Sequence, residues 1–265
     1  MFERKNRILL RELVKTDFKL RYQGSIIGYI WSVLKPLLLF AVMYVVFVRF
    51  LRFGEDVPHF AVALLLGMVL WNFFTETTNL GMMSIVGRGD LLRKLSFPTE
   101  IIVLSVAINA LINLVISFVI VFIFGLINGV DISHMAFVAP LLLIELFAFS
   151  LGAAFILATI YVRFRDIGPI WEVLLQAGMY MTPLIYPVTL VMDKNLTIAK
   201  LLMLNPMAQI IQDMRYLLTS PVNVTVWSLI EEKWIIVIPY LIPFVVLVLG
   251  YWIFKKNSKK FAEII

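Results

Sequence analysis

The sequence contains no cysteine and only two histidines among its 265 residues. Without cysteine the chain has no disulfides, no thiolate metal ligands and no cysteine nucleophile. The two histidines, His59 and His134, fall at the ends of apolar segments and have no partner at ligand spacing. An interfacial position is therefore favoured over a metal site, and we predict neither a catalytic residue nor a metal on this chain.

Motifs for nucleotide binding and hydrolysis are also missing. None of the 13 glycines has a second glycine five positions on, so the phosphate-binding pattern GxxxxGK[ST] is absent. The nucleophile elbow GxSxG is absent as well. We therefore expect that the chain does not bind ATP by itself and is not an enzyme. A membrane-embedded lipid-modifying enzyme would also need acid, base or metal groups clustered at one interface, and the sequence shows no such cluster.

Charged residues are scarce, at 15% of the chain, while 62% of the residues are hydrophobic. Soluble domains carry roughly 25% charged residues, and several apolar runs here reach the roughly 20 residues that cross a bilayer. The net charge of +6 is distributed beside the apolar runs, which does not favour a nucleic-acid partner. Residues 1–25 are basic and lack the apolar core of a signal peptide. We therefore expect the first apolar segment to be retained as a span.

Six apolar segments predict an all-α membrane protein with six transmembrane helices in a single domain, 1–265. Helices are favoured because the alternation of a membrane barrel is absent and because an open sheet edge cannot be satisfied in hydrocarbon. The predicted spans are 28–48, 60–86, 99–127, 136–162, 168–186 and 234–254.

The distribution of Lys and Arg beside these spans predicts the topology. Sixteen lie on one side, in residues 1–25, in the loops after the second and fourth spans, and in the tail. Six lie on the other side, and Arg215 is counted among them. Because cytoplasmic loops are enriched in Lys and Arg, both termini are predicted to be cytoplasmic.

Residues 1–25 have the pattern of an amphipathic interfacial helix that ends near Gly24. An apolar stripe lies beside basic residues spaced four apart. The stripe comprises Leu10, Leu13, Val14 and Phe18, and the basic residues are Arg7, Arg11, Lys15 and Lys19. A helix lying on anionic headgroups and a helix docked on a cytoplasmic partner both explain this pattern.

Residues 187–233 form a long outer stretch in which Asn205 and Pro206 predict a helix start. A helix from Pro206 to Leu218 would be about 20 Å long, too short to cross the hydrocarbon core. We expect it to dip in from outside or to lie across the mouth. Pro183 and Pro187 should break the fifth span at the same level.

Two ionisable groups lie inside predicted spans, Glu76 and Glu145. Asn72, Glu76 and Asn79 share one face of the second span, which should avoid lipid and face either a pore or another helix. Glu145 has no polar neighbour in the local pattern and is predicted to be a helix-packing group.

Aromatic residues make up 14% of the chain, and most should face lipid or the interface. A minority near the polar face of the second span, Trp71, Phe73 and Phe74, could instead stack against sugar rings in a channel.

Three motifs in order carry a resemblance to a known family. Residues Leu91 to Glu100 place a short basic amphipathic helix before a proline that starts the next span. Arg163 to Ile167 follow the fourth span, and Asn205-Pro206-Met207 precede the short outer helix. Together they resemble the type-2 ABC exporter permeases for polysaccharides, within the O-antigen, capsule and teichoic acid subfamily.

The resemblance implies a permease homodimer in the cytoplasmic (inner) membrane. Each copy would dock on a separate ATP-binding cassette subunit that holds ATP and Mg, and the cargo would be an undecaprenyl-linked glycan. Residues 87–98 would be the coupling loop, and a coupling helix at 91–97 would contact the ATPase through Leu91, Leu92, Arg93, Lys94, Leu95, Phe97 and Pro98. The helix 206–218 would be an outer gate, formed with Pro183, Pro187, Pro206, Ile210 and Met214.

Export of a lipid-linked glycan through such a permease leads to further hypotheses about individual side chains. The lipid pyrophosphate would meet basic groups at the cytoplasmic rim, for which Arg21, Lys35, Arg88 and Arg163 are candidates. The channel face would comprise Trp71, Asn72, Phe73, Phe74, Glu76 and Asn79.

Two other transporter types remain open. An ABC exporter for drugs or small lipids would share the architecture. A proton-coupled secondary transporter would use Glu76 and Glu145 as relay groups, would need no ATPase, and would be favoured by internal repeats.

Overall fold

The computed structural model describes residues 4–22, 30–55, 57–94, 96–130 and 134–264. Within these ranges all regular secondary structure is helical, which confirms the predicted all-α class. In chain order the helices are α1 (Arg4–Tyr22), α2 (Ile30–Met43), the π-helix η1 (Tyr44–Phe50), α3 (Phe60–Gly87), α4 (Gly89–Lys94), α5 (Glu100–Ile127), the 3-10 helix η2 (His134–Val138), α6 (Ala139–Arg163), α7 (Ile167–Met181), α8 (Thr189–Met192), α9 (Leu196–Met203), α10 (Pro206–Leu218), α11 (Val226–Leu229), α12 (Lys233–Asn257), the 3-10 helix η3 (Ser258–Lys260) and α13 (Phe261–Ile264). The predicted end of the first helix near Gly24 lies outside the described residues.

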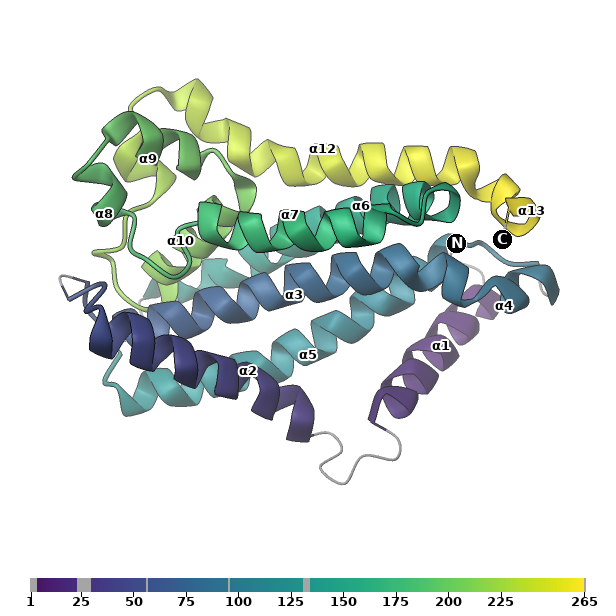
Figure 1. Cartoon of the computed structure of the whole chain (residues 1–265), viewed down its shortest axis with the longest axis horizontal. Helices are drawn as coiled ribbons and strands as arrows, with labels where there is room; N and C mark the ends of the chain where they lie inside the picture. The colour runs from purple at the N-terminus through teal and green to yellow at the C-terminus, as the bar shows by residue number, and fades with distance from the viewer. Residues whose placement is uncertain (1–3, 23–29, 56, 95, 131–133, 265) are drawn as a thin grey trace.

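The long helices run side by side in one elongated bundle, with short helices at both ends (Figure 1). Helices α4 and α13 lie at one end, which we call the terminal end. Helices α8, α9 and α10 lie at the opposite end, which we call the short-helix end. The bundle therefore separates the predicted coupling loop from the predicted outer gate by the length of its long helices.

Four helical segments are long and apolar enough to cross a membrane: Phe60–Gly87, Glu100–Ile127, His134–Arg163 and Lys233–Lys260. They overlap the second, third, fourth and sixth predicted spans. The fifth predicted span is shorter in the structure, and the first corresponds to α2 and η1, which run without a break from Ile30 to Phe50. The first contains the apolar helical stretch Pro36–Phe50, which changes to π-helical geometry at Tyr44, and α7 has 15 residues. The chain is thus a multi-pass membrane protein by the length and composition of its helices.

Helix α6 packs against α3 on one side and α12 on the other. Small residues allow both contacts, because they let two backbones approach closely. A Cβ added to Gly81 of α3 would lie 2.7 Å from the Cβ of Ala154 on α6. A Cβ added to Gly152 of α6 would lie 2.6 Å from the Cα of Leu247 on α12, and one added to Gly250 would meet the carbonyl of Gly152. These contacts make α6 the central helix of the bundle.

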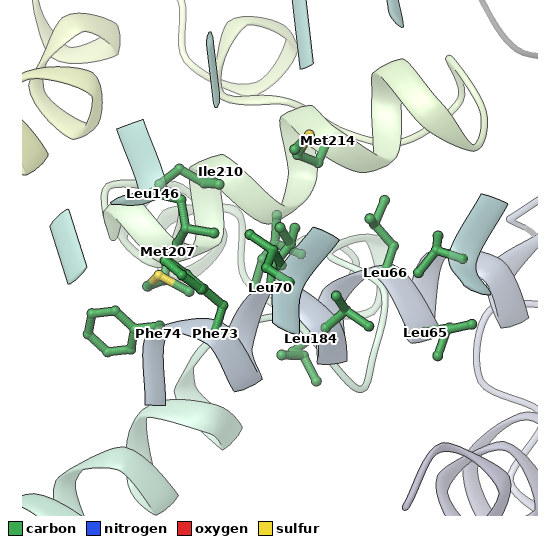
Figure 2. Packing of buried hydrophobic residues seen from close by; sticks show 14 of the residues in the cluster. Leu65, Leu66, Leu70, Phe73, Phe74, Leu146, Leu184, Met207, Ile210 and Met214 are labelled. Atoms are coloured by element: carbon green, nitrogen blue, oxygen red, sulfur yellow. The ribbon is translucent and has the colours of Figure 1, made fainter. Parts of the chain in front are cut away.

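The largest hydrophobic cluster joins α3 and α6 to the short helix α10 (Figure 2). It contains residues from the middle of α3, from α6, from α10 and from the segment after α7. Those labelled in Figure 2 are Leu65, Leu66, Leu70, Phe73, Phe74, Leu146, Leu184, Met207, Ile210 and Met214. Helix α10 is therefore part of the protein interior rather than a cover on its surface.

Candidate functional site

The start of α10 is fixed by Asn205, as the sequence predicts. Its Oδ1 accepts a hydrogen bond from the backbone amide of Met207 at 3.0 Å, and Pro206 occupies the first helical position, where its missing N–H costs nothing. The Asn205 side chain also donates through Nδ2 to Oγ1 of Thr182 at 3.2 Å. One residue thus caps α10 and ties it to the end of α7.

The fifth apolar segment breaks where the two prolines predict it. Helix α7 ends at Met181, and Thr182 adopts an extended conformation (φ −90°, ψ 132°), as expected for a residue before proline. In a continuing helix the amide of residue 187 would bond to the carbonyl of residue 183. Pro187 has no amide hydrogen. The carbonyl of Pro183 is therefore free to accept bonds from elsewhere.

Side chains of α10 provide those bonds. Nε2 of Gln212 donates to the Pro183 carbonyl at 3.1 Å, and Nη1 of Arg215 donates to the same oxygen at 2.9 Å. Arg215 also donates through Nη2 to the carbonyl of Leu184 at 2.6 Å and through Nε to that of Ala63 on α3 at 2.9 Å. A single guanidinium thus joins α10, the broken end of α7 and the start of α3.

Arg215 is 1% exposed, and among the described residues no carboxylate forms an ion pair with it. Its charge is balanced by backbone carbonyl dipoles, a role that suits the rigid five-donor fork of arginine. The buried position of Arg215 corrects the count of Lys and Arg residues that was used to predict the topology. Arg215 was counted with the Lys and Arg residues of an outer loop, whereas it lies inside the protein and carries no information about topology.

A second polar contact lies on another face of α10. Gln209 donates through Nε2 to Oδ2 of Asp213 at 2.8 Å, and the hydroxyl of Tyr240 on α12 donates to the same oxygen. Gln209 also faces Glu145 of α6, and the carboxyl groups of Glu145 and Asp213 act on each other electrostatically. Glu145, which has no polar neighbour in its local sequence pattern, thus faces polar groups of α10, up to 68 residues away in the sequence, and this position fits the helix-packing interpretation.

The polar face of α3 is turned at least partly toward α5. Nδ2 of Asn113 donates to Oε1 of Glu76 at 2.8 Å, which fits the helix-packing interpretation of this face. Asn79 is half-buried, and Asn72 is exposed. Of the three polar residues at this spacing, Asn72 is the one that the structure leaves open to its surroundings.

The aromatic residues near this face have different environments. Phe73 is stacked on Phe147 with a centroid distance of 6.4 Å, and Phe74 is stacked on Phe149 at 5.2 Å with an interplanar angle of 11°. Both are in the core and are not presented to a passing sugar in this arrangement. Trp71 is half-buried and contacts Phe74 at 5.8 Å. Of the three predicted aromatic residues, Trp71 is thus the one whose ring is partly exposed.

The predicted coupling loop contains α4, which runs from Gly89 to Lys94 rather than from 91 to 97. Arg93 and Lys94 are exposed, whereas Leu92 and Phe97 pack against a cluster that includes Phe261 of α13. Pro98 accepts a bond from the amide of Ile101 at 3.1 Å, which places it at the start of α5. Leu91 is half-buried, and Leu95 lies outside the described residues. The basic side chains are therefore the part of α4 that faces outward.

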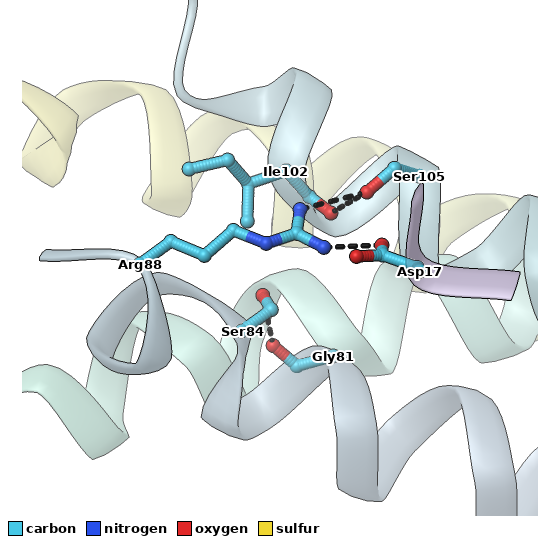
Figure 3. Close-up of polar contacts among 6 residues, drawn as sticks. All are labelled: Asp17, Gly81, Ser84, Arg88, Ile102 and Ser105. Carbon is cyan, nitrogen blue, oxygen red and sulfur yellow. Dashed lines mark hydrogen bonds and ion pairs between the residues drawn. The ribbon is translucent and has the colours of Figure 1, made fainter. Parts of the chain in front are cut away.

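Arg88, a candidate for the lipid headgroup rim, is held by other protein groups (Figure 3). It forms an ion pair with Asp17 of α1 and donates to Oγ of Ser105 on α5 at 3.0 Å. The Arg88 guanidinium group is thus bonded to α1 and to α5, and its ion pair with Asp17 connects α1 to the bundle.

The other rim candidates differ in their surroundings. Arg163 is exposed and lines, with Lys260, a cavity of about 190 Å³ at the terminal end. The side chains of Arg21 and Lys35 lie outside the part of the structure that is described. Among the described residues no group of three or more His, Cys, Asp or Glu side chains is arranged to hold a metal ion.

Three buried or paired groups were not singled out from the sequence: Asp17, Asp213 and Arg215. For Asp213 a local signal exists, because Gln209 and Asp213 are four residues apart on a helix that is otherwise apolar on that side. Asp17 is an acidic residue within a basic helix, which is a weak signal. Nothing in the local pattern indicates that Arg215 is buried.

Comparison with known proteins agrees with this arrangement. The family model described as ABC-2 type transporter matches residues 8–219. The O-antigen export system permease protein RfbA of Myxococcus xanthus is 30% identical over 202 residues, 76% of each chain. Two proteins of the same name from Klebsiella pneumoniae are 25% and 26% identical over 258 residues, 97% of this chain and 95% of theirs.

The match includes α1, the coupling loop and α10, and the Klebsiella alignments cover nearly the whole chain. The broken α7 and the buried α10 are thus part of the segment that the family model describes. The chain belongs to the family of ABC-2 type transporters.

Proposed function

We propose that this chain is the membrane subunit of an ATP-driven exporter of lipid-linked polysaccharide of the O-antigen, capsule or teichoic acid type. The observation that carries the proposal is the correspondence with O-antigen export permeases over 97% of this chain and 95% of the relative. The correspondence therefore extends over nearly all of both sequences. The chain itself would be the passage, and a separate subunit would hydrolyse ATP.

In this proposal the chain crosses the cytoplasmic (inner) membrane six times, with both termini in the cytoplasm. The terminal end would face the cytoplasm, since Arg93, Lys94, Arg163 and the lysines of the C-terminal tail lie there. The short-helix end would be the outer mouth. Span one would comprise α2 and η1, and span five would be α7 together with the segment that follows its break.

Two copies of the chain would enclose the channel, and each would dock on one ATP-binding cassette subunit that holds ATP and Mg. Closure of these subunits would push α4, which is joined by short connections to α3 and α5. The undecaprenyl pyrophosphate head would meet the basic terminal end, and the glycan would follow through the channel. Helix α10 would act as the outer gate, and its apolar side chains pack in one cluster with Leu70 and Phe73 of α3.

The cargo is tested by depletion of the chain in its host. We expect undecaprenyl-linked glycan to accumulate on the cytoplasmic side, detected by its protection from enzymes added to intact spheroplasts. Re-expression of the chain should clear it. If instead a drug or a small lipid accumulates while glycan export continues, the chain is an exporter of another cargo. Export that continues without any ATP-binding cassette subunit would favour a proton-coupled transporter.

The coupling role of α4 is tested on its exposed residues. Arg93→Glu and Lys94→Glu reverse charges that point away from the bundle, whereas changes at Leu92 or Phe97 would disturb the cluster with Phe261. We expect both reversals to lower export and ATPase association while the chain stays folded. Lys259→Glu, an exposed lysine at the same end but outside α4, is the matched control. Normal export in the Arg93→Glu/Lys94→Glu double variant would remove the coupling role.

A further inference from the structure

The contact between α6 and α10 holds more acidic oxygen atoms than the protein satisfies. Glu145 is 5% exposed and Asp213 is 8% exposed, and their carboxyl groups are close enough to act on each other electrostatically. Within the described part of the chain, Oε1 of Glu145 and Oδ1 of Asp213 are buried without a hydrogen-bond partner. Buried polar atoms are nearly always bonded, so these two oxygens require an explanation.

A third unsatisfied atom belongs to the same cluster. Gln209 is wholly buried, and its Nε2 donates to Asp213 while its Oε1 has no partner in the described structure. The hydroxyl of Tyr240 supplies the other donor to Asp213 and receives a bond from Nε1 of Trp227 at 2.9 Å. The hydrogen bonds from Gln209 and Tyr240 both reach Asp213 at Oδ2. Oε1 of Glu145, Oδ1 of Asp213 and Oε1 of Gln209 remain without a hydrogen-bond partner in the described structure.

Charge also indicates that the pair holds a proton. Glu145 and Asp213 would contribute two negative charges if both were ionised, and in the described structure no cation forms an ion pair with either of them. Two like charges side by side in an apolar wall are strongly disfavoured, and one proton removes their repulsion.

The donors also indicate where this proton lies. Asp213 accepts hydrogen bonds from Gln209 and Tyr240, which favour its ionised form. Glu145 has no donor at Oε1. A hydrogen on Glu145 directed at Asp213 would satisfy an unpaired oxygen on each residue in a single contact. We propose that Glu145 and Asp213 bind one proton between them, carried by Glu145, and that this proton holds α10 against α6.

A proton fits this cluster better than a metal ion. Hard cations such as sodium or calcium are held by a shell of several oxygen ligands. The cluster offers three oxygens without a partner, two from carboxyl groups and one from the Gln209 amide, which is fewer than the six to eight oxygen ligands of calcium. A shared proton needs two oxygens, and both are present.

The position of the pair gives the proton a mechanical consequence. Gln209 and Asp213 face α6 and α12, whereas Gln212 and Arg215 bond to the end of α7 and to α3. At about 100° per residue these two faces of α10 point roughly 110° apart. Loss of the proton would place two like charges between α10 and α6 and would leave the Arg215 contacts intact. Helix α10 should then separate from α6 first.

Other titratable groups around the pair are few. Tyr240 of α12 faces Asp213, and Arg215 of α10 is directed to backbone carbonyls on the other side. Among the described residues, Asp213 is the only charged group that acts on Glu145. The pair therefore responds to pH as a unit.

The proton itself is tested by infrared spectroscopy on the full chain in lipid nanodiscs. We expect the wild type at neutral pH to show the C=O stretching band of a buried protonated carboxylic acid. Glu145→Gln should lose this band, and Glu172→Gln, which alters an exposed glutamate of α7, should keep it. Absence of the band in the wild type, or its full retention in Glu145→Gln, overturns the proposal. If Glu145→Gln does not yield monodisperse protein, Asp213→Asn serves as the second variant, since it should abolish the pH response described next.

The seating of α10 is tested by thiol labelling, which is unambiguous because the chain has no cysteine. Tyr216→Cys reports on the half-buried side of α10, and Val222→Cys, 58% exposed, corrects for the reactivity of the thiol at each pH. The labelling ratio of the two sites should rise several-fold at alkaline pH in the wild-type background. It should stay constant with Glu145→Gln or Asp213→Asn. A ratio that rises equally in these backgrounds contradicts the proposal.

Sodium provides a further decisive comparison. If sodium, added at constant pH in place of choline, suppresses labelling of Tyr216→Cys and Glu145→Gln abolishes that suppression, the pair binds an alkali cation and the proton assignment is wrong. The gating role of α10 rests on the proposed function, whereas the proton does not. Neither experiment needs an ATPase or a glycan, so failure of the export assay and failure of the proton assignment are distinguishable.

Discussion

Gly152 of α6 and Gly250 of α12 lie back to back where the two helices cross. A Cβ on Gly250 would meet the carbonyl oxygen and the backbone of Gly152, and a Cβ on Gly152 would lie 2.6 Å from the backbone nitrogen of Leu247. Backbone atoms cannot move aside as a flexible side chain can. The two helices can keep this distance only while both positions are glycine.

We predict that Gly152→Ala and Gly250→Ala each destabilise the chain by about 1–3 kcal/mol, the usual cost of overpacking. The thermal transition in detergent, followed by monodispersity on size exclusion, should fall for both variants. Gly87→Ala is the control, because a Cβ there meets no atom within 4 Å. Equal stability of Gly250→Ala and Gly87→Ala would contradict the close crossing.

The ion pair between Asp17 and Arg88 is predicted to fasten α1 to the bundle. Charge reversal at either residue should increase the protease sensitivity of α1, and the double exchange Asp17→Arg with Arg88→Asp should restore part of the protection. Because the two side chains are 27% and 20% exposed, we expect a coupling energy of only about 1 kcal/mol. Additive effects of the two reversals would show that the pair does not hold α1.

Arg215 is predicted to be essential for the fold of the short-helix end. Arg215→Met would remove the side-chain donor to the carbonyl oxygens of Ala63 and Leu184 and one of the two donors to that of Pro183, and Arg215→Lys cannot reach all three with one ammonium group. We expect a loss of roughly 3–5 kcal/mol for the methionine variant, the range for breaking a buried charge contact. Thermal stability of the purified chain measures it. Arg93→Met, at an exposed site, should have little effect.

Asn195 and Asn205 both cap a helix, but only Asn205 also bonds to a residue far away in the sequence. Asn195 caps α9 through the amide of Ile198 at 3.1 Å, and Asn205 caps α10 in the same way but also bonds to Thr182. Each change to alanine should cost about 1 kcal/mol as a lost cap. Only Asn205→Ala should also loosen the end of α7, measured by hydrogen exchange around Thr182. Equal exchange in the two variants would show that the Thr182 bond contributes nothing.

The parts of this fold that the sequence predicts are those with local causes. The start of α10 at Pro206 follows from a cap and a proline at adjacent positions. The end of α7 at Met181 follows from Pro183, because a proline restricts the residue before it. The long apolar helices follow from their composition. The polar face of α3 was predicted to avoid lipid, and its Glu76 does bond to Asn113 of α5.

The parts that sequence reasoning missed depend on contacts between distant residues. Glu145 seemed isolated because Asp213 comes much later in the chain, and their contact exists only once α10 inserts between α6 and α12. Arg88 was assigned to lipid because Asp17 lies 71 residues away. Phe73 and Phe74 were candidates for the channel since aromatic composition does not show which rings stack on Phe147 and Phe149. Such pairings are set by packing, which no local periodicity encodes.

The bonds from α10 to the carbonyls of Pro183 and Leu184 have a consequence for how this end of the protein can move. A segment held by three hydrogen bonds at two backbone oxygens cannot slide past its neighbours residue by residue. The broken end of α7 and the helix α10 should therefore travel as one rigid body. Rotation is left to the residues that flank this body, and the nearest change from helical to extended backbone lies between Met181 and Thr182. We predict that this peptide is the hinge for any movement of the short-helix end relative to α7.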